Sequence, residues 1–192
     1  RRLMFATRQM IHPDNRVHPD LSLPEAEDYP AQIVAYAGSI AKDAHYDEHS
    51  HRRAQLFHIV SGAVTVETAR GTFVVPPERA VWIPPDVVHA VTYLHETSQR
   101  FLFLRPEAAR RLPKEPAVIR LSPLLVELIL AFMGYGRDEQ AGGPAARIAA
   151  VILDQLATHP AAPLYLPMPG SPRLRRAVKE LAADPGRPEN LA

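Results

Sequence analysis

The feature that most constrains the fold of this chain is a series of short apolar segments between residues 32 and 105. These segments are rich in Val, Ile, Phe and Tyr, and most are bounded by Gly or Pro, which is typical of β-strands joined by tight turns. Short strands at fairly regular spacing predict a β-sandwich or a small barrel. We place them at Gln32–Ala37, Gln55–Val60, Ala63–Thr68, Thr72–Val75, Val81–Ile83, Val87–Tyr93 and Phe101–Leu104.

The residues after about 107 follow a helical pattern instead. A Ser-Pro pair at 122–123 is an N-cap followed by proline at the first helical position, and apolar residues then recur with a helical period. We expect helices at 122–135, 145–159 and 171–184. The predicted division is an N-terminal arm at 1–31, a barrel at 32–106, a helical pair at 107–159, a proline-rich linker at 160–170 and a further helix in 171–192.

Composition narrows the class of function. The chain has 192 residues and a net charge of +1, so its overall charge favours neither a nucleic acid nor a membrane as partner. The absence of cysteine excludes disulfides, zinc ribbons and thiol nucleophiles. No apolar run reaches the roughly 18 residues of a membrane span. We therefore expect a cytoplasmic protein with no membrane partner.

The most chemically suggestive stretch contains several histidines between residues 45 and 55. In an extended strand, residues of equal parity share a face, so His49, His51 and Gln55 are expected to point the same way. His89 belongs to a later strand-like segment. Three imidazoles and an amide oxygen that converge inside a barrel suit a divalent first-row metal such as zinc, iron or nickel.

The same parity rule sorts the neighbouring residues. It places Asp47 on the ligand side of the strand and turns His58 away from it. Three aromatic residues, Phe57, Trp82 and Tyr93, are candidates for the lining of the pocket, with simple core packing as the alternative.

Two motifs in this region resemble those of the cupin superfamily. The pattern His-x-His-x3-acid followed by Pro-x-Gly-x-x-His stands here as His49-Ser50-His51 with Gln55, and then as Pro84-Pro85-Asp86-Val87-Val88-His89. The resemblance implies a mainly β protein with a double-stranded β-helix, a jelly-roll barrel whose mouth holds a metal or a small ligand. Gln55 replaces the usual glutamate and removes one negative charge from the ligand set. Asp86 replaces a turn glycine, which Asp tolerates because it accepts the left-handed conformation.

Longer stretches narrow the resemblance to the sensor domain of AraC-type transcriptional regulators. They cover His51–Leu56, Gly71–Pro85 and, at the junction to a DNA-binding half, residues 164–176. In that family a cupin domain is followed by a helical dimerisation pair, a linker and two helix-turn-helix modules. The resemblance implies a homodimer that binds a small-molecule or metal effector. The recognition helices would lie beyond residue 192, so DNA contact is expected only through a segment outside this chain, and no DNA-binding residue is assigned.

The apolar stripe of the first predicted helix has two interpretations. Leu124, Leu125, Leu128 and Phe132 form a dimer seam if the resemblance holds, or they cover the open side of the barrel. A helix that is apolar over a wide arc can do both.

The sequence leaves a second class of function open. A stand-alone cupin metalloenzyme, such as a dioxygenase or an isomerase, would use the same three-His/Gln site. A storage or metal-buffering cupin is a third interpretation. Gln55 in place of glutamate and the helix after the linker favour the regulator, so we predict a sensing domain that is not an enzyme. The sequence specifies neither the effector, nor the metal, nor the operator, nor whether the output is activation or repression.

Overall fold

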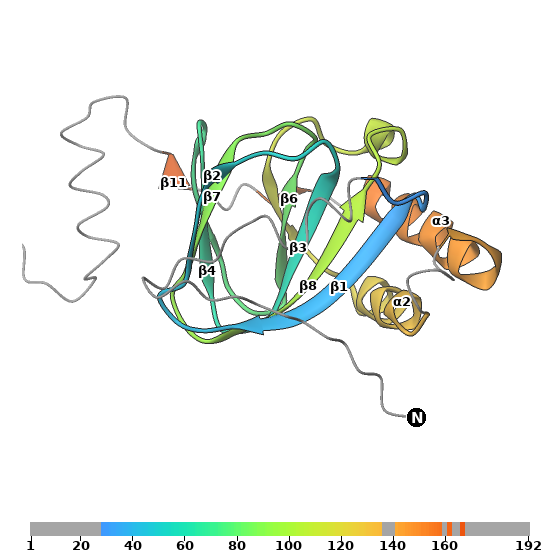
Figure 1. Ribbon diagram of the computed structural model, residues 1–192, viewed down its shortest axis with the longest axis horizontal. Helices are drawn as coiled ribbons and strands as arrows, with labels where there is room; N and C mark the ends of the chain where they lie inside the picture. The colour runs from blue at the N-terminus through green and yellow to red at the C-terminus, as the bar shows by residue number, and fades with distance from the viewer. Residues whose placement is uncertain (1–27, 136–140, 159–160, 163–165, 168–192) are drawn as a thin grey trace, which may run out of the picture.

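The strand-like segments form two antiparallel sheets that enclose a barrel interior (Figure 1). The computed structural model describes residues 28–135, 141–158, 161–162 and 166–167. One sheet has the order β1-β8-β3-β6-β9-β10 and the other the order β11-β5-β4-β7-β2. The strands are β1 (Ile33–Ile40), β2 (His45–His49), β3 (Ala54–Ser61), β4 (Val64–Thr68), β5 (Gly71–Val75), β6 (Arg79–Ile83), β7 (His89–Tyr93), β8 (Thr97–Leu104), β9 (Ala117–Arg120), β10 (Ala161–Ala162) and β11 (Leu166–Pro167).

All the predicted strands are present, with bounds that differ by a few residues, and the mainly β, cupin-like fold is confirmed. Four strands were not predicted, and two of them, β10 and β11, are two-residue strands in the segment that we expected to be a linker. β2 is rich in His, Asp and Glu and lacks a clear apolar alternation. β9 lies in the segment that we expected to be helical, and it pairs with β6, so the sheet continues beyond residue 106. A short 3₁₀ helix, η2 (Ala108–Arg111), leads into it.

The central strands of the six-stranded sheet are buried on both faces. Along β3, Phe57 and Ile59 belong to the cluster inside the barrel, whereas Leu56 packs on the outer face with residues from the helices. This explains why six consecutive residues at the start of β3 are buried. Successive side chains of a strand point to opposite faces, so continuous burial requires a cover on each side.

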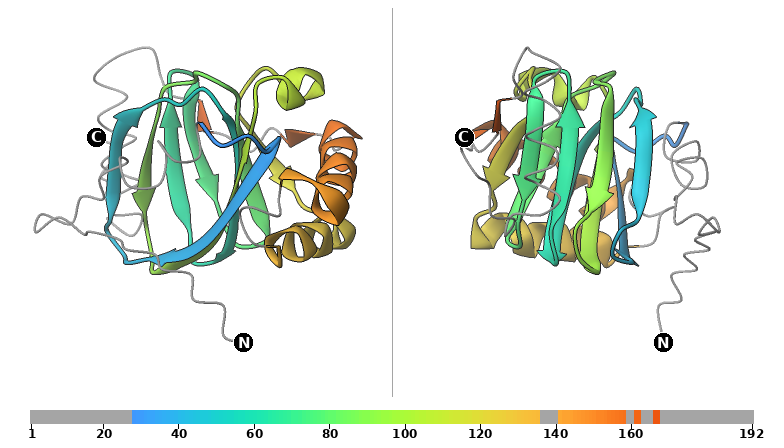
Figure 2. Two further views of the ribbon diagram at one scale, coloured as in Figure 1. Left: turned by 45° about the vertical axis from the view of Figure 1, so that its right-hand side comes forward. Right: turned by 90° about the vertical axis from the view of Figure 1, so that its left-hand side faces the viewer.

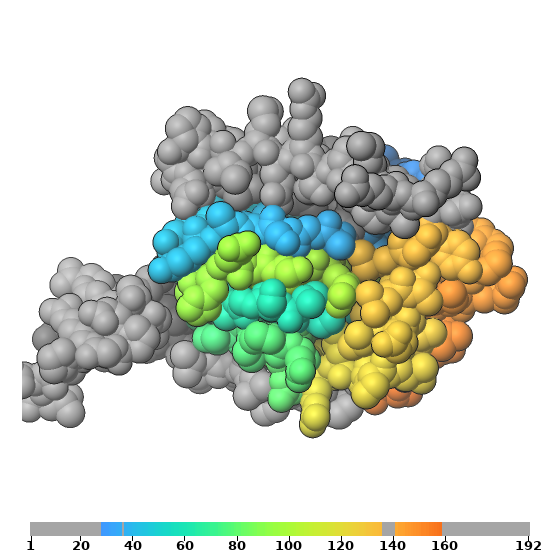
Figure 3. Space-filling view, turned by 90° about the horizontal axis from the view of Figure 1, so that it is seen from below, coloured from blue at the N-terminus to red at the C-terminus, as the bar shows by residue number. Residues whose placement is uncertain are grey.

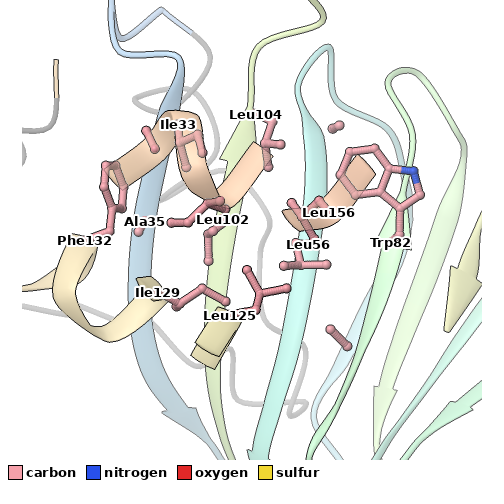
Figure 4. Close-up of a cluster of buried hydrophobic side chains, with 14 of the residues drawn as sticks. Ile33, Ala35, Leu56, Trp82, Leu102, Leu104, Leu125, Ile129, Phe132 and Leu156 are labelled. Carbon is pink, nitrogen blue, oxygen red and sulfur yellow. The ribbon is translucent and has the colours of Figure 1, made fainter. Parts of the chain in front are cut away.

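Two helices, α2 (Pro123–Met133) and α3 (Gly143–Thr158), cover the outer face of this sheet (Figure 2). Ser122 caps α2, because its hydroxyl oxygen accepts a hydrogen bond from the Leu125 N–H at 3.2 Å, which confirms the predicted start of the helix. Figure 4 shows the resulting cluster between the helices and the sheet. The buried helix residues are Leu125, Ile129 and Phe132 of α2, and Ala145, Ala149, Ile152 and Leu156 of α3.

This packing buries some residues of the predicted dimer seam on α2 and leaves others exposed. Leu125 and Phe132 are fully buried against the chain's own sheet and are not available to a second copy. Leu128 is partly buried, and Leu124 is 55% exposed. The interpretation that the stripe covers the barrel is therefore correct for its centre, and only its Leu124 edge faces outward.

The lower end of the molecule brings distant segments together. Seen from below, the ends of β1, β8, β3 and β6 lie in a row, with α2 beside them (Figure 3). This end is remote from the histidines, and its outer side carries the cleft described in the last Results subsection.

Some predictions fall on residues that the structure does not describe. They are the N-terminal arm up to residue 27, most of the linker at 160–170, and the helix expected in 171–192. Within the described ranges, no helix is long and apolar enough to span a membrane.

Candidate functional site

Strand pairing brings the histidines together at one end of the barrel. His49 ends β2 and His89 begins β7, and the two residues are directly opposite each other in the ladder, with ring centroids 4.3 Å apart. His51 lies between β2 and β3, and its ring centroid is 5.1 Å from that of His89. One ring nitrogen from each histidine lies within 4.8 Å of the others. The structure thus assembles three of the predicted ligands into one cluster.

A bulge in β2 explains how they meet. Tyr46 pairs with Val91 and His49 pairs with His89, so the register shifts between the two pairs. A bulge places two residues of one strand opposite a shorter stretch of its partner, which breaks the simple alternation of faces. Both Tyr46 and His49 can then face inward, and their rings lie 6.1 Å apart.

The same bulge removes Asp47 from the predicted ligand side. Asp47 is exposed, and its carboxylate lies 3.4 Å from Nε2 of His45 rather than near the cluster. Its backbone carbonyl accepts a hydrogen bond from Nδ1 of His49 at 2.7 Å. The expectation from parity was wrong for this residue, because parity holds only along an unbroken strand.

Backbone carbonyls fix the orientation of all three rings. Nδ1 of His89 donates to the Val87 carbonyl at 2.9 Å, Nδ1 of His49 donates to Asp47, and Nδ1 of His51 donates to the carbonyl of Arg53. Since a carbonyl can only accept, each neutral ring keeps its lone pair on Nε2. The Nε2 atom of His89 is buried and has no hydrogen-bond partner. Histidines that bind metals are held in this way, with the second ring nitrogen donating to a carbonyl.

Gln55 completes the predicted ligand set. It is buried at the start of β3, and its Oε1 lies 3.2 Å from Nε2 of His51. Metal–ligand bonds of about 2.1 Å place neighbouring donor atoms about 3 to 3.5 Å apart, so this distance is that of two ligands around one ion. Neutral nitrogen donors with one amide oxygen suit zinc, nickel or iron better than calcium or magnesium, which prefer carboxylates. The residues present therefore fit a first-row transition metal.

Burial favours the neutral form of two of the three histidines. Desolvation above all, opposed by the hydrogen bond to Val87 and assisted by the charges of His49 and His51, lowers the pKa of His89 to about 3. Burial also lowers the pKa of His49. Histidines must be neutral to bind a metal, so at neutral pH the rings of His49 and His89 are already in the form that binds.

This burial predicts that acid destabilises the metal-free protein. His89 takes up a proton near pH 6.5 when unfolded but only near pH 3 when folded, so the unfolded state binds more protons between these values. We expect the unfolding free energy to fall by up to about 1.4 kcal/mol per pH unit below pH 6.5 from this residue. Urea unfolding of chelator-treated protein at about pH 7 and about pH 5 measures it, with His89→Gln expected to show the shallower dependence. Equal slopes in the two proteins would contradict the assignment.

Aromatic side chains line the barrel below the histidines. Phe57 and Tyr93 lie inside as predicted, with ring centroids 6.3 Å apart, and the Tyr93 hydroxyl donates to Oε1 of Gln99 at 2.8 Å. The ring of Phe101 lies 4.6 Å from that of Phe57 by centroid, and the ring of Phe103 lies 5.6 Å from that of His51. Sequence analysis missed Gln99, Phe101 and Phe103, although their equal parity in β8 could have indicated a shared face.

Trp82 lies on the other side of the sheet. It belongs to the cluster under the helices, and its indole N–H donates to the Pro113 carbonyl at 2.8 Å. In β6 its neighbours Val81 and Ile83 face the barrel interior instead. The structure therefore does not bring Trp82 into the candidate pocket, and its role is packing between the sheet, the helices and the segment after η2.

The turn before His89 ties the two motifs to each other. Asp86 adopts a φ of 62°, which confirms that aspartate takes the left-handed position expected of glycine. Its N–H donates to the His51 carbonyl at 2.9 Å. One turn thus positions His51 and His89 together.

Comparison with known proteins assigns a family to this barrel and its histidine cluster. The AraC-like ligand binding domain family matches residues 31–167. The match covers well over half of the chain, and the chain belongs to this family.

A curated relative agrees with this assignment. The HTH-type transcriptional regulator NimR of Escherichia coli (strain K12) is 33% identical over 137 residues, which are 71% of this chain and 50% of the relative. The chain therefore spans about half the length of this relative.

Solved structures with similar barrels include a cupin superfamily protein from Desulfitobacterium hafniense DCB-2, at 16% identity and a TM-score of 0.37 over 38% of this chain and 68% of that one. KdgF from Halomonas sp. is 23% identical, with a TM-score of 0.37 over 39% of this chain and 70% of that one.

Proposed function

We propose that this chain is the effector-sensing and dimerisation domain of an AraC-type DNA-binding transcriptional regulator. The observation that carries the proposal is the three-histidine cluster inside a domain of the AraC-like ligand binding family. The relative named as an HTH-type regulator supports the DNA-binding context, which this chain would reach through a further segment. A regulator of this kind acts on chromosomal DNA, so we expect the protein in the cytoplasm.

The effector site is the cluster of His49, His51 and His89 with Gln55. Its donor atoms suit zinc, nickel or iron, or the polar group of a small molecule that enters at this end of the barrel. The unpartnered Nε2 of His89 supports this role, because a buried polar atom without a partner is costly unless something binds it.

A route from this site to the N-terminal segment is present. The Arg53 carbonyl holds His51, and the buried Arg53 guanidinium donates to the carbonyls of Ala31 and Phe103, at 3.0 and 3.4 Å, and to that of Tyr29. A ligand that moves His51 would act directly on Arg53. We infer that a ligand bound at the cluster changes the position of residues 29–31 through this arginine. The effector site and the N-terminal segment are then physically coupled.

The dimer surface that we propose lies on the outer edges of the two helices. Leu124 is 55% exposed, Leu130 is 40% exposed, and Val151 of α3 is 42% exposed. Large apolar side chains that are exposed on two neighbouring helices are candidates for a protein interface. Figure 2 shows the two helices together on one side of the barrel.

We expect the chain to be a dimer in solution and Leu124→Glu to make it a monomer. A charge in the centre of an apolar contact is desolvated without a partner, which costs several kcal/mol. Light scattering after gel filtration measures the mass against the 21.3 kDa of one chain. The matched control is Val88→Glu, because Val88 is 52% exposed but lies on the barrel. A wild-type mass of one chain, or dissociation by both variants, would contradict the proposed surface.

The functional proposal is tested on the protein as its own cell produces it. We expect that protein to bind DNA, and we expect zinc, nickel, iron or a small effector to change this binding. His51→Ala should abolish the response and retain DNA binding. Substrate turnover with iron in a protein that does not bind DNA would instead establish the cupin metalloenzyme.

A further inference from the structure

A second polar site lies on the outer face of the six-stranded sheet, at the lower end of the molecule. It is a cleft of about 950 Å³ between the ends of β3, β6, β8 and β9 and the first turn of α2. Figure 3 views this end directly, with the residues of β3 and β8 beside those that lead into α2. Cavities of this size hold small organic ligands rather than single ions. The cleft is separated from the histidine cluster by the sheet itself.

His58 lies in the wall of this cleft and is 4% exposed. It points to the opposite side of β3 from Phe57, as parity predicts. Its Nδ1 atom is buried and has no hydrogen-bond partner. A buried polar atom without a hydrogen-bond partner is energetically costly, so the free Nδ1 of His58 indicates a position where a ligand atom binds.

Three arginines line the cleft together with His58. Arg100 is directly opposite His58 in the β3–β8 ladder, and Arg79 is directly opposite Arg120 in the β6–β9 ladder. All three residues line the cleft. Arg79 and Arg120 have the strand parity of Val81 and Val118, which face the barrel, so they reach the cleft at the rim of the sheet and not on the face that carries His58. No ion pair to any of the three occurs within the part of the chain that the structure describes. Like charges placed opposite each other in a sheet repel, so this pairing is unfavourable without an anion. Guanidinium groups present paired donors that match carboxylate and phosphate oxygens.

The remaining lining completes the description of the ligand. Glu78 and Glu127 contribute two carboxylates, which leaves the arginines in excess. The apolar side chains of Leu121 and Val126 line the cleft near the start of α2. The helix N-terminus adds a partial positive charge at this point. The lining therefore combines a cationic half with an apolar half.

We propose that this cleft is a second ligand site, which binds a small organic anion through Arg79, Arg100, Arg120 and His58 and packs the apolar part of that anion against Leu121 and Val126. The anionic group is a carboxylate or a phosphate. This site goes beyond the proposed effector site, because it uses no residue of the histidine cluster and lies outside the barrel. It contacts α2 directly and so joins the sheet to the helical pair.

The state of His58 agrees with this assignment. Burial, and to a lesser extent the charge of Arg100, lowers its pKa to about 4. The imidazole is thus neutral at neutral pH and offers one donor and one acceptor to a ligand. Glu78 and Glu127 already counter part of the positive charge of Arg79, Arg100 and Arg120. An anion in the cleft would counter the rest of this charge and would raise the pKa of His58.

The experiment is a calorimetric titration of the whole chain with hexanoate, hexyl phosphate and 1-hexanol, three probes with the same apolar tail. We expect one anion per chain for the carboxylate, the phosphate or both, and binding of 1-hexanol that is weaker by about tenfold or more. The better of the two anions identifies the headgroup. Equal binding of 1-hexanol and the anions, or no saturable binding of either anion, would overturn the proposal.

Variants locate the binding. The double variant Arg100→Gln/Arg120→Gln is expected to weaken anion binding by about tenfold or more, and the exposed Arg110→Gln of η2 is the matched control. A single Arg79→Gln variant and the shift of the His58 imidazole signal in NMR titrations give independent readouts if the double variant fails to fold. His89→Gln should leave anion binding unchanged, which separates this site from the effector site. Unchanged affinity in the arginine variants, or a loss in Arg110→Gln or His89→Gln, would overturn the proposal.

Discussion

Replacing His89 by glutamine is expected to abolish the binding of first-row metals by this domain. His89 supplies the buried, unpartnered Nε2 at the centre of the cluster, within 4.3 Å of the His49 ring and 5.1 Å of the His51 ring by centroid. Even the loss of residues that only support metal ligands costs about 10- to 100-fold in affinity, so loss of a ligand should cost about 100-fold or more. Calorimetric titration of chelator-treated protein with zinc, nickel and iron(II) measures it.

The matched control for this variant is His95→Gln. His95 is an exposed histidine outside the cluster, so its replacement removes an imidazole without touching the site. We expect its metal affinity to equal that of the unaltered chain. Equal affinity in His89→Gln and the unaltered chain would show that the metal binds elsewhere. If the unaltered chain binds none of the three ions, the cluster serves the polar group of a small-molecule effector.

The second large effect is expected from Phe132→Ala. Phe132 is completely buried between α2, α3 and the sheet, and removal of its ring leaves a cavity in the cluster that holds both helices. Replacement of a buried phenylalanine by alanine costs about 3 to 5 kcal/mol. Denaturant unfolding followed by circular dichroism measures the loss.

Leu124→Ala is the control from the same helix. Leu124 is 55% exposed, so its truncation should change the unfolding free energy of the monomer by about 0.5 kcal/mol or less. Since dimerisation also stabilises the fold, the two variants are compared at one low protein concentration. Equal effects of the two substitutions would contradict the placement of α2 in the structure.

The parts of the fold that could be predicted from the sequence are those in which the residue types favour a single local conformation. The Ser-Pro pair at 122–123 has one common role, the start of a helix, and the structure has it there. Asp86 was assigned to a left-handed turn because aspartate tolerates that conformation, and its φ is 62°. The convergence of His49, His51 and His89 was predicted from a two-part motif rather than from either segment alone, and the structure shows it.

The parts that could not be predicted depend on what covers each face. Both Leu56 and Phe57 are completely or almost completely buried, so alternation along β3 reveals two faces without showing which one is inside the barrel. For this reason Trp82 was grouped with Phe57. The apolar stripe of α2 was identified correctly, but its period does not say whether a sheet or a second chain covers it.

The bulge in β2 could not be predicted from the sequence either. The residues of β2 are His, Tyr, Asp, Glu and His, and they carry no apolar pattern that would mark an irregular register. The convergence of His49 and His51 was therefore expected from an unbroken strand, whereas the structure achieves it with a bulge and a turn. The three histidines still meet in one cluster, whereas the Asp47 carboxylate lies outside it, next to His45.

The measurement that tests the central proposal most directly is the intact mass of the protein as its native cell produces it. If this chain is the sensing half of a DNA-binding regulator, the mass is well above 21.3 kDa, by an amount that fits two helix-turn-helix modules. A native mass equal to 21.3 kDa would contradict the regulator and favour a cupin that acts alone.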